Sequence, residues 1–418
     1  MEQKLKVGIV TLAGGFDVEW GKEMMLKAVD VLKNMDVDVV SPMKLVRSDE
    51  DARMAAKKFN QEGIDLLIIH HGTFMNGNLA VILAQEIHAP IVLWAMPEPS
   101  LGGRVQLRSN SLVGLHMNAS HLSKLGIKYK YFYASPDDKE FQDSMRKYLK
   151  VVNAVKRLRR AKIGLAGYRV PGFYVSNFDE MDLRRFIGIE VRHIDLSQVL
   201  MERRYVPEDE AKKVAKEIEE KLDEKVFLSE EEARKIMESL KSRLESPIEL
   251  KIETDPEKHF MNLAKTFLAF QRIFAKYDLD AMAVKCWPEF FMLFGHAACS
   301  TLGLLTDKGY IAGCEADMGG TVTMLLQFFL TGEPPFFADF VSINEKDNTG
   351  LMWHCGNAPL SLAARKGKKI LEQSYYMGGA FQFSLKGGRV TFARLGDCLL
   401  YTSPSPRDLS TSRMPSSA

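Results

Sequence analysis

Short apolar segments alternate with amphipathic segments along the N-terminal part of the chain. The apolar segments are rich in Val, Ile and Leu and are bounded by Gly, Pro or Asp: Val7–Leu12, Val37–Val40, Leu66–His70 and Ile91–Trp94. Such runs are typical of strands that are buried on both faces of a parallel sheet. Between them, Gly21–Asn34 and Asp49–Gln61 carry apolar residues at helical spacing. This alternation predicts a doubly wound α/β domain, Rossmann-like or flavodoxin-like, over residues 1–162.

The same alternation predicts a second α/β domain over residues 163–340. Its expected strands are Ile163–Ala166, Ile189–Ile194, Ala281–Val284 and Tyr310–Gly313. Its expected helices include Met261–Tyr277, Phe294–Leu305 and Val322–Leu330. The segment Pro207–Ser246 has Glu and Lys three and four residues apart, which is typical of solvated helices.

The pattern changes after Gly332-Glu333-Pro334-Pro335, where expected strands follow one another without helices between them. These strands are Phe336–Ile343, Gly350–Trp353 and Phe381–Leu385. They predict a β-rich C-terminal domain over residues 341–397.

Residues 398–418 differ from the rest of the chain, with a bias to Ser, Pro, Thr and Arg and no apolar period. Residues 398–408 correspond to the in-frame translation of a sequencing-library transposon adapter, and residues 412–418 correspond to the far end of the same adapter. We therefore expect this tail to be an artefact outside the fold. On this interpretation the β-rich domain is truncated near Asp397.

Composition narrows the class of protein. The chain has 418 residues, of which 46% are hydrophobic and 26% are charged, values typical of a globular protein with more than one domain. A net charge of +2 gives no reason to expect a nucleic-acid or membrane partner. Five cysteines without a paired framework suit a reducing compartment, and no secretory signal or spanning segment is evident. We expect a cytoplasmic protein.

Three polar motifs follow apolar segments late in the sequence. They are Lys285–Glu289, Cys314–Gly320 and Trp353–Asn357. Together they offer the carboxylates of Glu289 and Asp317 and the imidazole of His354. This donor set suits Mn²⁺ or Mg²⁺ better than a structural zinc ion. Because few protein groups hold such an ion, substrate oxygens can take its open positions.

Each of these residues also has a simpler interpretation. Glu289 alone is consistent with a surface residue at a strand end, and Asp317 with the N-cap of the helix that follows it. A single His354 beside Trp353 is more often a core histidine. The metal site is predicted by the set, since all three residues follow apolar segments with Gly or Pro nearby.

Other candidates are weaker. His70 and His71 end an expected strand, where adjacent side chains point to opposite faces, so one metal ion cannot take both. Gly14 and Gly15 do not form a GxGxxG fingerprint, and no Walker lysine follows them. A thiol nucleophile at Cys286 or Cys355 has no evident base nearby in the sequence.

With these motifs placed, the sequence resembles the L-fucose isomerase and L-arabinose isomerase superfamily, specifically its shorter fucose-isomerase-like members. The resemblance extends from Lys6 to Asp397 and is most distinctive over the three motifs. It implies two α/β domains followed by a barrel-like β domain. It also implies Mn²⁺ or another divalent cation, and a homo-oligomer whose active sites lie near subunit contacts.

Carried over residue by residue, the resemblance implies that Glu289, Asp317 and His354 bind the metal. It implies that Glu289 and Asp317 are also the catalytic carboxylates. Four further residues stand where we expect substrate contacts: Lys285, Trp287, Asn357 and Trp94.

The implied activity is aldose–ketose isomerisation of an open-chain, L-fucose-like sugar by enediolate proton transfer between C1 and C2. A divalent ion stabilises the enediolate oxygens, and two carboxylates exchange the roles of base and acid. Which carboxylate acts first stays open, as does the sugar, with a pentose or a sulfonated hexose as alternatives. A non-catalytic or regulatory sugar-binding protein on the same scaffold is a different class, because a fold does not fix a function.

Overall fold

The computed structural model describes residues 4–99, 107–244, 252–373 and 379–396. The chain divides into two compact units, Met1–Lys156 and Arg157–Ala418. The predicted domain boundaries after residues 162 and 340 stay predictions. The adapter-like segment 398–418 lies outside the described residues.

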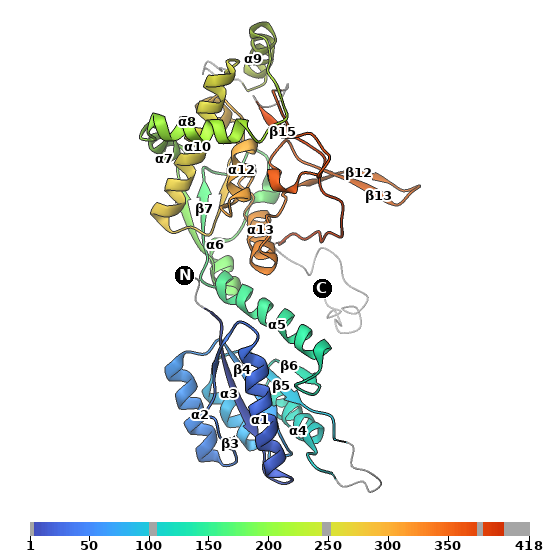
Figure 1. Cartoon of the computed structure of the whole chain (residues 1–418). Helices are drawn as coiled ribbons and strands as arrows, with labels where there is room; N and C mark the ends of the chain where they lie inside the picture. Colours follow the sequence, from blue (N-terminus) through green and yellow to red (C-terminus); the bar gives the residue numbers. More distant parts are fainter. Residues whose placement is uncertain (1–3, 100–106, 245–251, 374–378, 397–418) are drawn as a thin grey trace, which may run out of the picture. The chain divides into compact units, whose positions relative to one another are not determined.

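A parallel six-stranded sheet forms the centre of the first unit (Figure 1). Its strands are β1 (Lys6–Leu12), β2 (Asp38–Val40), β3 (Leu45–Val46), β4 (Leu66–His71), β5 (Ile91–Ala95) and β6 (Tyr129–Tyr133). The order is β2-β1-β4-β5-β6, and β3 also pairs with β1. The four strands expected from apolar runs are confirmed as β1, β2, β4 and β5.

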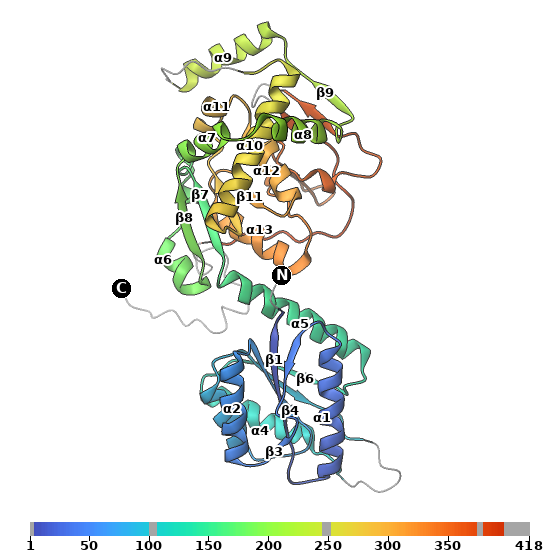
Figure 2. The ribbon, with the colours of Figure 1, turned by 60° about the vertical axis from the view of Figure 1, so that its left-hand side comes forward.

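Helices cover both faces of this sheet, and Figure 2 shows α1 and α2 on opposite sides of it. The helices are α1 (Val18–Lys33), α2 (Asp49–Glu62), α3 (Asn78–Glu86), α4 (Ser111–Lys124) and α5 (Lys139–Leu158). Along β4, Leu66 and Ile68 pack with α1 and α5, whereas Leu67 and Ile69 pack with α2, α3 and α4. Both faces of β4 are therefore buried, which explains its unbroken apolar sequence. The doubly wound α/β fold is confirmed for this unit.

The second unit contains a smaller parallel sheet of four strands. These are β7 (Lys162–Ala166), β8 (Glu190–Ile194), β10 (Ala281–Val284) and β11 (Ile311–Gly313), in the order β11-β10-β7-β8. Its main helices are α7 (Leu196–Arg204), α8 (Glu208–Glu219), α10 (Pro256–Tyr277), α12 (Ala298–Asp307) and α13 (Met318–Thr331). Shorter helical segments are η1 (Tyr174–Ser176), α6 (Glu180–Asp182), η2 (Leu183–Ile187), α11 (Glu289–Phe294) and η3 (Leu360–Leu362). The expected strands and helices are thus present, and the α/β class holds here too.

The pattern of the charged segment Pro207–Ser246 predicts helices, but the segment is not helical throughout. Between α8 and α9 (Glu230–Leu244) it contains the strand β9 (Glu224–Val226). This strand pairs in parallel with β14 (Ile370–Glu372), which itself pairs with β15 (Ala380–Gln382). β9 is exposed and charged, so it has no apolar pattern by which the sequence could predict it. It is defined by its backbone pairing with β14, which is distant in the sequence.

The region after α13 is rich in strands, as expected. β12 (Asp339–Asn344) and β13 (Thr349–Trp353) form an antiparallel hairpin that extends away from the rest of this unit in Figure 1. Every residue of β12 is exposed, including Phe340 and Ile343. Asp339 at the start of the hairpin and His354 just after its end both lie near Glu315, which follows β11 of the parallel sheet.

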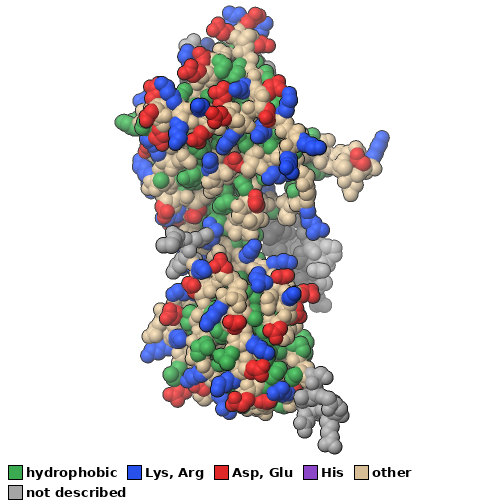
Figure 3. All heavy atoms as spheres, viewed as in Figure 1, with side chains coloured by type: hydrophobic (Ala, Val, Ile, Leu, Met, Phe, Trp, Pro, Cys, Tyr) green, Lys and Arg blue, Asp and Glu red, His purple; other side chains and the backbone are tan. Residues whose placement is uncertain are grey.

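The face of the molecule drawn in Figure 3 has no large patch of charges of one sign. On the face drawn in Figure 3, basic and acidic side chains are interspersed over both units. No helix in the described ranges combines the length and the apolar character that a membrane span requires.

Candidate functional site

The turn between β11 and α13 brings acidic side chains to the carboxyl end of the second sheet. Glu315 and Ala316 both adopt left-handed backbone conformations, with φ of 63° and 52°. Such conformations are uncommon for residues with a side chain and are found at functional turns. The amide of Ala316 donates to the carbonyl of Val284 at 2.9 Å, which ties this turn to β10. Glu315 therefore projects from a turn that is fixed at both ends.

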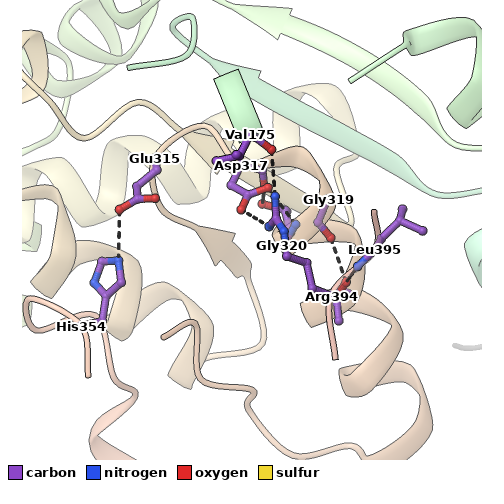
Figure 4. A network of polar contacts seen from close by, with 10 residues as sticks. Val175, Glu315, Asp317, Gly319, Gly320, His354, Arg394 and Leu395 are labelled. Atoms are coloured by element: carbon purple, nitrogen blue, oxygen red, sulfur yellow. Dashed lines mark hydrogen bonds and ion pairs between the residues drawn. The ribbon is translucent and has the colours of Figure 1, made fainter. Parts of the chain in front are cut away.

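Asp317 follows as the N-cap of α13. Its Oδ1 accepts a hydrogen bond from the amide of Gly320 at 2.9 Å, and its other oxygen pairs with the guanidinium of Arg394. The side chain is almost fully buried. Figure 4 shows Asp317 turned toward Gly320 and Arg394, while the neighbouring Glu315 faces His354.

His354 comes directly after β13 and is buried. Its Nδ1 accepts a hydrogen bond from the amide of Cys355 at 2.9 Å, and its Nε2 lies 3.7 Å from Oε1 of Glu315. Nε2 is buried and has no hydrogen-bond partner among the described residues. Burial alone lowers the pKa of His354, but its contacts with Cys355 and Glu315 raise it to about 10. The surroundings therefore favour a positive charge on or beside this ring.

Asp339, the first residue of β12, completes an acidic group around His354. One ligand atom each from Glu315, Asp339 and His354 lies within 4.8 Å of the other two. Burial, followed by the negative charges of Glu315 and Asp317, raises the pKa of Asp339. Two carboxylates and an imidazole with an unpartnered nitrogen are a hard O,O,N donor set, and this set fits Mn²⁺ or Mg²⁺.

Glu289, the other predicted carboxylate, begins α11 after the turn that follows β10. Its Oε2 lies 2.6 Å from Nζ of Lys285, which is itself nearly buried. Among the residues that the structure describes, neither Glu289 nor Asp317 belongs to a three-residue ligand group with His354. The structure thus brings His354 together with Glu315 and Asp339, and the metal-binding and catalytic roles of Glu289 and Asp317 stay predictions.

The predicted substrate-contact residues lie in different surroundings. Asn357 is buried, and its Oδ1 has no hydrogen-bond partner in the described part of the chain. Trp287 packs against the core of the second unit. Trp94 belongs to the first unit, is fully buried, and donates its indole N–H to the carbonyl of Ala134. Its ring packs on Phe141, so the unit as described leaves no ring face for a sugar. The substrate-binding roles of these residues, and of Lys285, stay predictions.

The two histidines of β4 behave as their alternation predicts. His70 Nδ1 lies 3.0 Å from Oγ1 of Thr11, whereas His71 contacts Asn118 and the carbonyl of Trp94. Burial lowers the pKa of His70 to about 3 and that of His71 to about 4. Both are neutral core histidines in the described structure.

Comparisons with known proteins relate this chain to a family of isomerases. The family model for the fucose/sulfoquinovose isomerase N-terminal domain matches residues 9–159. A sulfoquinovose isomerase of Priestia megaterium (strain ATCC 12872 / QMB1551) is 29% identical over 383 residues, which cover 91% of this chain and 79% of that protein. The sulfoquinovose isomerase of Alkalicoccus urumqiensis is 28% identical, covering 85% of this chain and 74% of that protein.

These matches support a member of the fucose-isomerase-like superfamily. They agree with the resemblance found in the sequence and indicate an isomerase of the intramolecular oxidoreductase class. Among solved structures, a periplasmic solute binding protein from Actinobacillus succinogenes 130z with bound D-allose matches 79% of the chain and 93% of its own. The TM-score of that match is 0.19 and the identity 9%, so it carries no inference.

Sequence reasoning missed two residues of the acidic group in this fucose-isomerase-like chain. Glu315 lies within the Cys-Glu-Ala-Asp motif, and no sequence pattern indicates which of the two carboxylates in this motif faces His354. Asp339 carries no motif signal, because only the return of the β12–β13 hairpin brings it to His354.

Proposed function

We propose that this isomerase interconverts the aldose and ketose forms of a sulfonated hexose with the help of a divalent cation. The relatives named sulfoquinovose isomerase support the substrate class, because they align over most of this chain. The L-fucose-like substrate predicted from the sequence is the alternative within the same chemistry.

The observation that carries the proposal is the group formed by Glu315, Asp339 and His354. A divalent ion bound there would act as a Lewis acid toward vicinal sugar oxygens. The three side chains come from the turn after β11 and from the two ends of the β12–β13 hairpin, so the folded second unit preorganises them. Preorganised charge is the main means of stabilising an enediolate, whose negative charge develops during proton transfer.

Proton transfer between C1 and C2 requires a carboxylate close to each carbon. In the proposal Glu289 and Asp317 have these roles, as the family resemblance implies. Lys285 positions Glu289 through its 2.6 Å ion pair. Gly320 and Arg394 fix both oxygens of Asp317, so its carboxylate has a defined orientation (Figure 4).

The decisive experiment is a substrate panel with sulfoquinovose, D-glucose, L-fucose and L-arabinose, in which ketose formation is followed by NMR. We expect sulfoquinovose to be isomerised with the highest kcat/KM, chelator to abolish turnover, and Mn²⁺ to restore it. Preference for L-fucose would overturn the substrate class while leaving the isomerase chemistry. Turnover that persists after complete metal removal would overturn the metal dependence.

Two variants distinguish the carboxylates proposed to bind the metal from those proposed to transfer the proton. Glu315→Gln should weaken the activation by Mn²⁺, whereas Glu289→Gln should lower kcat even at saturating Mn²⁺. Glu333→Gln, at an exposed position just after α13, is the matched control and should be neutral. Near-normal kcat in Glu289→Gln with saturating Mn²⁺ would refute the catalytic role of Glu289.

The homo-oligomer with active sites near subunit contacts and the cytoplasmic location form part of this proposal. Free thiols at Cys286, Cys299, Cys314 and Cys355 support a reducing compartment. Light scattering coupled to size-exclusion chromatography tests the assembly, and a monomeric active enzyme would contradict it.

A further inference from the structure

The thiols of the second unit converge on one place. Cys286 follows β10, Cys314 follows β11, Cys299 lies in α12, and Cys355 follows β13; these are the free cysteines of the described residues. The sulfur atoms of Cys299 and Cys355 lie 3.3 Å apart, and Cys314 hydrogen-bonds to both Cys299 and Cys286. Buried cysteines often act as small apolar side chains, but packing alone does not require four distant segments to bring their sulfurs into contact.

His354 lies at one end of this row of thiols. Its Nδ1 is 3.5 Å from the sulfur of Cys355. One ligand atom each from Cys299, Cys355 and His354 lies within 4.8 Å of the other two. The same imidazole therefore faces carboxylates with its Nε2 edge and thiols with its Nδ1 edge.

These separations match those of a tetrahedral thiolate–imidazole site. Bond lengths of ~2.3 Å to sulfur and ~2.0 Å to nitrogen give ligand–ligand separations of ~3.8 Å for S···S and ~3.5 Å for S···N around a zinc ion. The observed S···N distance of 3.5 Å equals the expected value, and the observed S···S distance of 3.3 Å is ~0.5 Å shorter than the expected one. Small side-chain rotations bring the three atoms to a common cation, and the partly exposed Cys355 gives that cation a route in.

We propose that Cys299, Cys355 and Nδ1 of His354 form a binding site for a thiophilic d¹⁰ cation such as Zn²⁺ or Cd²⁺. Binding replaces two S–H bonds by two metal–sulfur bonds and releases two protons to the solvent, together with the Nδ1 proton of His354 where the ring is protonated. The hydrogen bond from the Cys355 amide to Nδ1 is given up when the cation binds.

This site goes beyond the proposed isomerase function and does not depend on it. Its relation to the carboxylate group is nevertheless direct. A neutral imidazole has one nitrogen lone pair free for a metal, so a cation on the thiol edge and a cation on the carboxylate edge compete for His354. The thiol site is thus also a place where a soft cation would antagonise a hard one.

The test is a titration of the metal-free protein with Cd²⁺, followed by the ultraviolet sulfur-to-cadmium charge-transfer band. A Cys398→Ser background removes the one cysteine outside the described residues. We expect one Cd²⁺ per chain with this band. Cys299→Ser and Cys355→Ser should each weaken binding more than ~100-fold, beyond the ~10–100-fold that loss of an outer contact costs. Cys286→Ser is the matched control, since it belongs to the same row of thiols but not to the ligand group, and it should retain the affinity.

Absence of the band in a protein with unchanged circular dichroism would overturn the proposal, and so would full affinity in both serine variants. Equal loss of affinity in Cys286→Ser would also overturn it, because the thiols would then act only as a packed cluster. Catalytic activity does not enter any of these readouts, so failure of the isomerase proposal leaves the result interpretable.

Discussion

Nε2 of His354 lies 3.7 Å from Oε1 of Glu315, and this pair joins two parts of the second unit that are distant in sequence. Glu315 belongs to the turn after β11 of the parallel sheet, whereas His354 follows the last strand of the β12–β13 hairpin. Asp339 at the other end of the hairpin belongs to the same group. The position of the hairpin and the geometry of the acidic group are therefore coupled.

Removing one carboxylate from this group should weaken metal binding directly. We expect Glu315→Gln and Asp339→Asn each to lower the Mn²⁺ affinity by more than about tenfold, because each removes one anionic ligand. Isothermal titration calorimetry on the metal-free protein measures this. Glu345→Gln, at the exposed tip of the same hairpin, is the control and should bind Mn²⁺ as the unmodified protein does. If the three variants bind equally, the cation lies elsewhere.

A glycine in α12 controls how closely the loop after His354 can approach. A Cβ at Gly303 would lie 2.9 Å from the carbonyl oxygen of Ala358 and 3.0 Å from that of Asn357. Alanine normally stabilises a helix by ~1 kcal/mol relative to glycine, but contact with two backbone oxygens should cost more, about 1–3 kcal/mol. We expect Gly303→Ala to lower both the free energy of unfolding and the activity.

Chemical denaturation and turnover on the same sample test this expectation. Gly388→Ala is the control, since no described residue other than its chain neighbours lies within 4 Å of the position that its Cβ would take. A Gly303→Ala protein that is more stable than the parent would show that the loop moves aside at no cost.

The sequence predicts the sheets well because their strands are buried on both faces. β1, β4 and β5 are buried on both faces over most of their length, so they are visible as segments rich in Val, Ile and Leu. β9 is charged, exposed and three residues long, and only its backbone pairing with β14 defines it. The residues around β9 in the sequence contain no signal that predicts its pairing with the distant strand β14.

The acidic group shows the same limit. His354 lies in a distinctive motif, whereas the Cys-Glu-Ala-Asp motif offers two carboxylates, Glu315 and Asp317, either of which could face it. Side-chain direction decides between them: the turn after β11 directs Glu315 to His354, and the N-cap geometry directs Asp317 to Gly320. The position of Asp339 beside His354 depends on the β12–β13 hairpin, and no rule of sequence spacing predicts how that hairpin is placed.

Acid should destabilise the first unit through its buried histidines. Burial lowers the pKa of His70 from its usual 6.5 to about 3, so between these values the unfolded chain binds a proton that the folded chain does not. The stability is present above pH 6.5 and is lost as the pH falls toward 3, at up to ~1.4 kcal/mol per pH unit for each such histidine. His70→Asn should make this fall less steep.

Urea unfolding of the protein at a series of pH values from about 7 to about 4 measures the slope. The control is His88→Asn, at an exposed position of the same unit, which should leave the slope unchanged. Identical slopes in His70→Asn and the parent would mean that other groups govern the acid limb.

Asp317 has a structural and a predicted chemical role, and substitutions can separate them. As N-cap of α13 it accepts a hydrogen bond from Gly320, and loss of such a cap costs about 1 kcal/mol. Serine also caps helices well but cannot accept a proton as a carboxylate does. We therefore expect Asp317→Ser to keep most of the stability and lose turnover, whereas Asp317→Ala should lose both.

Asp255→Ala provides the matched control, because Asp255 caps α10 by the same kind of contact, with the amide of Lys258, and should lower stability without lowering turnover. Turnover that follows stability alone across the three variants would assign Asp317 a capping role and leave the second carboxylate of the reaction to be sought in Glu315 or Asp339.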